Sequence, residues 1–246
     1  MKIICPEIFK QFENVAAAQS TRLGGLPSPF GAFNLGESVG DDPTVVAQNR
    51  TLFCESLGFD KQNLAKSKQV HGLEVLVVNN AGTYEGYDAL ITTQKGILLA
   101  VTIADCAPIL LYDKDQKTIA AVHAGWKGTL GNLVYKTLQI MQNSLGTNPA
   151  HVYAYIGTCI SSKNYEVDSD VALHFEEKYR PYHPKTSKYH LDIKQHNLDQ
   201  LTNFGVPLKQ IEVSPYCTLA DRDLFYSHRG ENGKAGRMLA GIGMLN

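Results

Sequence analysis

The sequence predicts an α+β fold, with a sheet-rich core of mostly antiparallel or mixed strands and flanking helices. Short runs rich in Val, Ile, Leu, Thr and Tyr outnumber the helical segments. Several of these runs, especially between Glu74 and His123, follow one another without an intervening helix, which favours antiparallel pairing over a doubly wound parallel sheet. Because no repeat, low-complexity tract or linker divides the chain, we expect one domain over residues 1–246.

Start and stop signals predict the helices. Asp42 is a suitable cap for a helix with Pro43 at its first position, and Gly58 closes that segment. An apolar stripe from Leu130 to Leu145, with spacings of three and four residues, predicts a second helix that ends near Gly146. The four predicted helices cover residues 43–57, 130–145, 169–178 and 192–204.

One of the apolar stretches must contain a sharp change of chain direction between two strands. Residues 96–112 form the longest apolar stretch, but Asp105 and Pro108 interrupt it, and it is shorter than the roughly 20 residues that a membrane helix needs. We therefore expect two buried strands that meet at this corner. The predicted strands cover residues 74–78, 89–92, 97–103, 109–112, 117–123, 152–156 and 237–244.

Charge and cysteine content limit the classes of partner and compartment. Lys and Arg total 23 against 24 Asp and Glu, so the net charge of -1 gives no reason to expect nucleic acid or an acidic membrane surface. A small-molecule substrate is the expected partner, and no obligate protein partner is inferred. The N-terminal residues lack the pattern of a secretory signal, and five dispersed cysteines fit reduced thiols, so we expect a cytoplasmic protein.

Three predicted strand ends each carry one metal-binding side chain, namely His71, Cys106 and His123. Glycine or alanine follows each of them, which lets the backbone come close to a site. Two imidazoles and one thiolate would make three bonds to zinc and leave a fourth position open, as in catalytic sites. The spacing matches no compact zinc signature, and two core histidines with a small buried thiol also fit the residues. Asp105, a carboxylate inside an apolar run, favours an assembled polar site.

Several segments in one order carry a family resemblance over nearly the whole chain. They are residues 20–25, 34–36, 39–43, 68–72, 104–112, 123–128, 223–227 and 236–238. In these segments the chain resembles the YfiH-type proteins, known as multicopper polyphenol oxidoreductase or laccase-domain proteins and associated with purine nucleoside phosphorylase activity. The chain departs from the family pattern at Thr158, where proline is expected, and at Glu37-Ser38, where histidine is frequent.

The resemblance implies a YfiH-like domain with a zinc site at His71, Cys106 and His123, which are also the catalytic candidates. It further implies cleavage of adenosine, inosine and methylthioadenosine with phosphate, alongside deamination of adenosine. The two departures bear on the shape of the pocket and on substrate preference, because neither affects a proposed metal ligand.

Three further residues are candidates for substrate binding. Arg22 lies beside two glycines, and its planar guanidinium matches phosphate oxygens two at a time. Lys127 would add a positive charge near the metal, and Gln69 would share the side of a strand with His71 and orient a substrate. Each has a simpler interpretation: a surface turn for Arg22, a solvated lysine for Lys127 and a satisfied backbone group for Gln69.

Three other functions use the same residues. Copper can occupy a site of two His and one Cys, which suits the oxidation of polyphenols, although the eight His residues include no His-X-His pair of the laccase kind. A metal-free hydrolase would use Cys106 as nucleophile, His123 as base and Asp105 or another group to orient the base; the resemblance associates it with editing of peptidoglycan precursors. A binding module would use the metal structurally, but the open fourth position argues against it.

Overall fold

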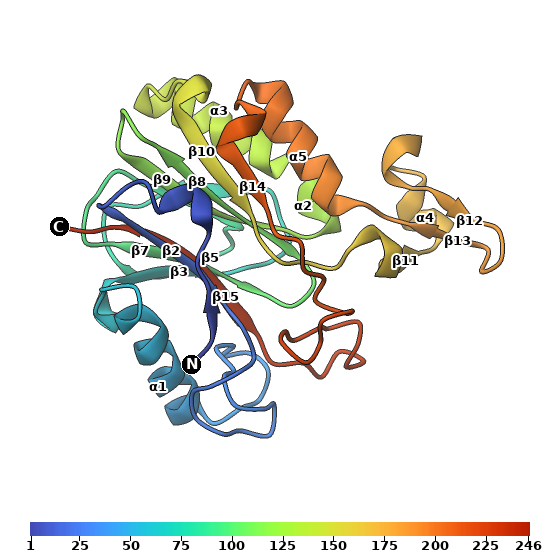
Figure 1. Cartoon of the computed structure of the whole chain (residues 1–246), viewed down its shortest axis with the longest axis horizontal. Helices are drawn as coiled ribbons and strands as arrows, with labels where there is room; N and C mark the ends of the chain where they lie inside the picture. Colours follow the sequence, from blue (N-terminus) through green and yellow to red (C-terminus); the bar gives the residue numbers. More distant parts are fainter.

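The computed structural model describes residues 1–246, in which two six-stranded sheets pack face to face. Figure 1 shows α1 on the outer side of one sheet and α3 and α5 on the outer side of the other, so the layers run helix, sheet, sheet, helix. The α+β fold class and the mixture of antiparallel and parallel pairs are confirmed. The helices are α1 (Pro43–Glu55), α2 (Trp126–Leu130), α3 (Leu133–Leu145), α4 (Ser169–Ala172) and α5 (Ile193–Phe204).

The strands of the first sheet come from both ends of the chain and from its middle. In spatial order they are β1 (Ile3–Ile4), β2 (Val15–Ser20), β15 (Met238–Met244), β7 (Leu98–Ile103), β3 (Leu64–Lys68) and β5 (Gly82–Glu85). The second sheet contains β14 (Ile211–Val213), β10 (Val152–Ile156), β8 (Ala107–Asp113), β9 (Thr118–Ala124), β6 (Ala89–Thr92) and β4 (Val75–Val77). A small third sheet of β11 (Glu166–Val167), β13 (Lys188–His190) and β12 (Tyr182–His183) forms an arm at the side of the molecule (Figure 1).

Each large sheet is buried on both faces, and strand periodicity divides its side chains between two clusters. On β8, Ile109 and Leu111 belong to the cluster beneath α3 and α5, whereas Leu110 and Tyr112 belong to the cluster between the sheets. A third cluster joins α1 to the outer face of the first sheet. Burial on both faces explains why the central strands are apolar without alternation.

The corner predicted near Asp105 is confirmed, and it connects the two sheets. β7 lies in the first sheet and β8 in the second, although only Ala104, Asp105 and Cys106 separate them. Asp105 has a φ of 86°, in the left-handed region that non-glycine residues rarely adopt. β8 then pairs antiparallel with β9 so that Pro108 faces His123, which brings residue 106 close to the end of β9.

The structure corrects two helix predictions. The helix expected over 169–178 is only the four-residue α4, followed by a 3-10 turn at Glu177–Tyr179, because only Ala172 and Phe175 of that segment are buried. The helix expected over 130–145 is divided at Asn132, which has a left-handed φ of 57°. Gly146 ends α3 as predicted.

The helices are too short or too polar to span a membrane.

Candidate metal centre and cavity

The three predicted metal ligands come together at one point. His71 follows β3, Cys106 lies at the corner between the sheets, and His123 is near the end of β9. One ligand atom of each residue lies within 4.8 Å of those of the other two. The imidazole rings of His71 and His123 are 4.9 Å apart between centroids and nearly perpendicular, at 75°. The fold therefore assembles residues that are distant in sequence.

Hydrogen bonds to carboxylates hold two of the three ligand segments in unusual conformations. His71 has a left-handed φ of 56°, and the buried Asp88 accepts its backbone N–H at 3.1 Å. Asp105, immediately before Cys106, accepts the hydroxyl of Thr218 at 2.6 Å and the backbone N–H of Arg229 at 2.7 Å. Conformations of this kind cost about 1–3 kcal/mol each and persist only where surrounding contacts enforce them.

The backbone of Gly125 lies against the centre. A Cβ at this position would lie 2.9 Å from Cys106 Sγ and 3.3 Å from His71 Cδ2. Gly125, two residues after His123, therefore has a steric reason to lack a side chain, because a Cβ would overlap the sulfur.

The electrostatics of the centre favour a thiolate beside a charged imidazole. Burial raises the pKa of the Cys106 thiol, but the charge of His123 and hydrogen bonds from both histidines outweigh it and lower that pKa to about 6. Burial likewise lowers the pKa of His123, whereas the Cys106 thiolate and Asp88 raise it to about 9. The thiolate is the form that binds metal, so the protein already favours the required state.

The donor set fits a metal ion. A thiolate and two imidazoles suit zinc and also copper, and the short separation of the ligand atoms allows all three to reach one ion. His123 Nδ1 lies 2.8 Å from Asp88 Oδ1, so its Nε2 is the nitrogen left for a metal. All three residues line one cavity, so a fourth coordination position would face open space.

The cavity beside this centre has a volume of about 660 Å³ and a strongly cationic wall. Its basic residues are Arg50, Lys66, Lys68, Arg229 and Arg237, and its aromatic residues are Trp126 and Tyr165. Two acidic residues, Glu37 and Asp105, also line it, and Glu37 pairs with Arg50 and, at 2.7 Å, with Lys66. The cations suit an anionic group of a substrate, and the rings suit a planar one.

Only one of the three predicted substrate residues lines this cavity. Gln69 does, but its amide bonds the backbone and hydroxyl of Thr102, at 2.7 to 2.9 Å, which matches its simpler interpretation. Arg22 instead pairs with Glu231 at 2.6 Å, and Lys127 extends over the neighbouring Trp126 ring. The substrate contacts of Arg22 and Lys127 therefore remain predictions without support from their placement.

Sequence reasoning missed Asp88 and, among the cavity arginines, Arg50. Asp88 stands alone before the predicted strand 89–92, and that isolated carboxylate is the same signal that identified Asp105. It is Asp88, and not Asp105, that contacts His123. For Arg50 no sequence signal exists, because it is one basic residue on a predicted helix. Its burial, with 3% exposure, is a property of the fold.

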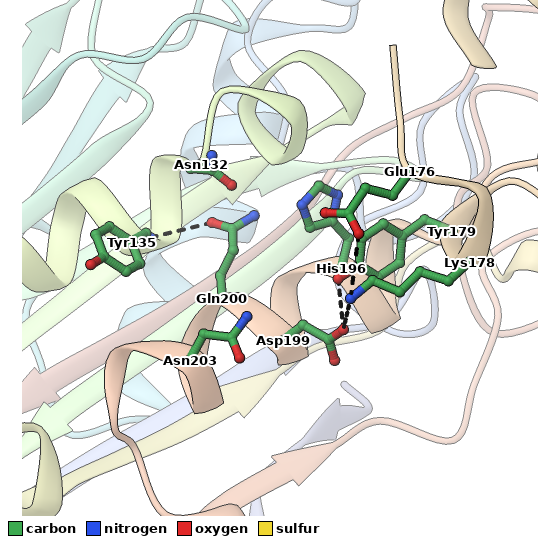
Figure 2. Close-up of a pocket in the computed structure, with 9 residues that line it drawn as sticks. All are labelled: Asn132, Tyr135, Glu176, Lys178, Tyr179, His196, Asp199, Gln200 and Asn203. Atoms are coloured by element: carbon green, nitrogen blue, oxygen red, sulfur yellow. Dashed lines mark hydrogen bonds and ion pairs between the residues drawn. The ribbon is translucent and has the colours of Figure 1, made fainter. Parts of the chain in front are cut away.

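A second polar cavity lies between α3, α5 and the base of the arm, and shares no residue with the first (Figure 2). Its charged groups are paired with one another. Asp199 accepts the hydroxyl of Tyr179 at 2.6 Å and the ammonium of Lys178 at 3.2 Å, and the His196 ring stacks on Tyr179. These contacts attach the arm to α5. The polar residues of this cavity therefore have a structural role.

The fold and the centre define a class of α+β protein with a His–Cys–His cluster in a cationic cavity, and comparison with known proteins identifies its family. Residues 16–245 match the family model described as multi-copper polyphenol oxidoreductase laccase, so the chain belongs to this family, in agreement with the YfiH-type resemblance.

Relatives and solved structures agree over almost the full length. The chain is 40% identical over 223 residues to a purine nucleoside phosphorylase of Corynebacterium glutamicum, covering 87% of this chain and 89% of that protein. It is also 40% identical over 234 residues to a purine nucleoside phosphorylase of Deinococcus radiodurans, covering 94% and 89%. The structure of the hypothetical protein YfiH of Bacillus licheniformis matches with a TM-score of 0.92 and 32% identity, covering 98% and 96%. YlmD of Geobacillus stearothermophilus matches at 0.89 with 34% identity, covering 96% and 94%.

Proposed function

We propose that this chain is a zinc-dependent purine nucleoside phosphorylase that also deaminates adenosine. The proposed substrates of phosphorolysis are adenosine, inosine and methylthioadenosine. The observation that carries the proposal is the meeting of His71, Cys106 and His123 in the wall of a cationic cavity. The names of the relatives, purine nucleoside phosphorylase, support the substrate class. Five free thiols support a cytoplasmic location.

In this proposal, Cys106 Sγ, His123 Nε2 and one nitrogen of His71 hold the zinc. When bound, the metal supplies Lewis-acid chemistry that polarises the substrate or activates water. The chain keeps the thiol ionised, as the lowered pKa of Cys106 indicates, and Asp88 holds the ring of His123 with Nε2 toward the thiol. The left-handed backbone at His71 sets the direction of the third ligand.

Phosphorolysis requires that an anion and a nucleoside bind together. A phosphate oxygen forms a bond to the ribose carbon that carries the base, the bond to the purine nitrogen breaks, and the base leaves with the electron pair and takes up a proton. Arg229 and Arg237 line the cavity and would neutralise the phosphate, while the rings of Trp126 and Tyr165 would bind the purine. Arg22 was the sequence candidate for phosphate, but its ion pair with Glu231 makes the cavity arginines better candidates.

The test combines metal content with a balanced product analysis. Protein purified without added metal should contain about one zinc per chain, as a three-ligand site requires. With adenosine it should release adenine and hypoxanthine only when phosphate is present, together in equal amount with ribose 1-phosphate, and form inosine with or without phosphate. Chelator should abolish both reactions, and zinc should restore them. Full activity in metal-free protein would contradict the proposal.

A second candidate function is supported by the contacts of His123. The Cys106 thiol, the His123 ring and Asp88 follow one another as nucleophile, base and orienting carboxylate, which is the order of a cysteine hydrolase. The resemblance suggests peptidoglycan precursors as substrates. This function predicts activity in the presence of chelator, so the same experiment separates it from the zinc mechanism. The donor set also accepts copper, and oxidation of phenols by copper-loaded protein would indicate the polyphenol oxidase alternative.

A further inference from the structure

We infer that Asp88 is a positioning residue that holds both imidazoles of the centre in the arrangement that metal binding needs, a role that rests on the proposed metal site. The residue lies directly before β6 and is 1% exposed. Its carboxylate accepts four hydrogen bonds. Oδ1 accepts His123 Nδ1 at 2.8 Å and the backbone N–H of His71 at 3.1 Å. Oδ2 accepts the backbone N–H of Gly72 at 2.7 Å and that of Val70 at 3.2 Å.

On the side of His123, Asp88 selects the tautomer. A carboxylate accepts hydrogen bonds, so the Nδ1 that faces it carries the proton, and the lone pair of Nε2 is directed to the other side of the ring. The backbone of the same pair is also joined, because His123 N donates to Asp88 O at 2.7 Å. Two contacts with one residue therefore fix both the position and the rotation of this ring.

On the side of His71, hydrogen bonds to Asp88 hold a backbone segment that no strand or helix holds. The segment around His71 belongs to no strand, and the His71 side chain is exposed, so packing contributes little to its position. Three consecutive backbone N–H groups, from Val70 to Gly72, converge on the carboxylate and form an anion-binding nest around it. The left-handed conformation of His71 is part of this nest. This conformation sets the direction in which the His71 side chain leaves the backbone.

Substitution by asparagine removes the carboxylate while keeping its shape. Each carboxylate oxygen of Asp88 faces two donors, so an amide group must point its NH₂ at one of these pairs in either orientation. With the NH₂ toward Gly72 and Val70, Asp88→Asn loses both hydrogen bonds of Oδ2. With the NH₂ toward His123, it loses the His71 N–H bond and keeps His123 only if the ring proton moves to Nε2, the nitrogen that the metal needs. Removal of an outer carboxylate of this kind typically weakens metal binding by about 10- to 100-fold, and we expect a loss in that range.

The experiment measures zinc dissociation constants of the full chain by competition with a chromophoric chelator. The matched control is Asp113→Asn. Asp113 is also fully buried and accepts two backbone N–H groups, from Asp115 and Gln116, but has no histidine partner. We expect weaker zinc binding only in Asp88→Asn, with an altered thiolate-to-cobalt absorption band after loading with cobalt. Equal zinc affinity in Asp88→Asn and wild type would overturn the role of Asp88 alone. A wild type that binds no zinc would overturn the metal site as well.

A measurement on the wild type covers the case in which Asp88→Asn fails to fold. In protein labelled with ¹⁵N-histidine and loaded with zinc, His123 should carry its proton on Nδ1 and show a metal-shifted Nε2 resonance. The His123→Gln variant assigns that signal by its loss. A proton on Nε2 of His123 would overturn the inference, because Asp88 would then have no N–H of this ring to accept.

Discussion

Gly125→Ala should damage the metal centre while leaving the fold intact. Gly125 lies between β9 and α2, and its backbone, with φ −73° and ψ −175°, is extended and open to any residue. The substitution therefore adds no backbone strain. Its one effect is a methyl group 2.9 Å from Cys106 Sγ and 3.3 Å from His71 Cδ2.

The size of this overlap sets the expected effect. Non-bonded carbon atoms are favourable at about 3.5–4.0 Å, so the Cys106 sulfur must move away by roughly 0.6 Å or more. Metal sites accept ligand distances only within about 0.2 Å of their ordinary values. We therefore expect zinc affinity and phosphate-dependent nucleoside cleavage to fall at least about tenfold, with an overpacking cost of about 1–3 kcal/mol in the free energy of unfolding.

The assay compares zinc affinity, kcat/KM for adenosine with phosphate, and the metal-free melting curve. Gly128→Ala is the matched control. It lies three residues further on, in α2, where a Cβ would meet Leu133 and the His123 carbonyl oxygen at 3.4 Å, an ordinary contact. This control should behave as wild type. If Gly125→Ala binds zinc as tightly as wild type, the centre does not need the close approach of its backbone, and the steric reasoning is wrong.

Three other expectations follow from the site. His71→Ala should abolish nucleoside cleavage as completely as His123→Ala, because a three-ligand metal site needs both imidazoles; native turnover in a folded, metal-free His71→Ala would instead favour a cysteine nucleophile. Arg229→Ala should raise the KM for phosphate about tenfold and Arg22→Ala should raise it little, which steady-state kinetics at varied phosphate measures; the reverse order would return the phosphate role to Arg22. In metal-stripped protein, Cys106 has a pKa lowered to about 6, so its alkylation by iodoacetamide should be fast at neutral pH and slow as the pH falls through about 6; a midpoint near 9 would contradict this.

Local signals in the sequence predicted much of the secondary structure. Asp42 caps α1 through a hydrogen bond to the N–H of Thr44, and Gly146 ends α3 in a left-handed conformation. These features depend on neighbours in the sequence, so they could be recognised there. β2 could not, because its Ala-rich sequence has little preference for a strand, and it forms one by pairing with β15 from the other end of the chain.

The ligands of the candidate centre were also accessible from the sequence, since thiolate and imidazole are the donors that zinc prefers. Their expected place at strand ends holds for His123, near the end of β9, whereas His71 lies in the loop after β3. The residues that position these ligands could be predicted only in part. Asp88 carried the same signal as Asp105, but its contact with His123 depends on the antiparallel pairing of β6 with β9. A lone buried carboxylate predicts that a partner exists and does not say which one.

By itself, the sequence determined the chemistry available to this protein: the metal-binding side chains, the net charge of -1, the start of α1, the end of α3 and an α+β arrangement. Only the tertiary structure decided which residues share a cavity. It sends β7 and β8 into different sheets, brings Arg229 and Arg237 from near the C-terminus to the cavity beside Cys106, and leaves Arg22 outside, paired with Glu231. The physical reason is that capping and periodicity act between near neighbours in the chain, whereas the cavity depends on contacts between distant segments, such as that of Asp105 with Arg229, 124 residues apart.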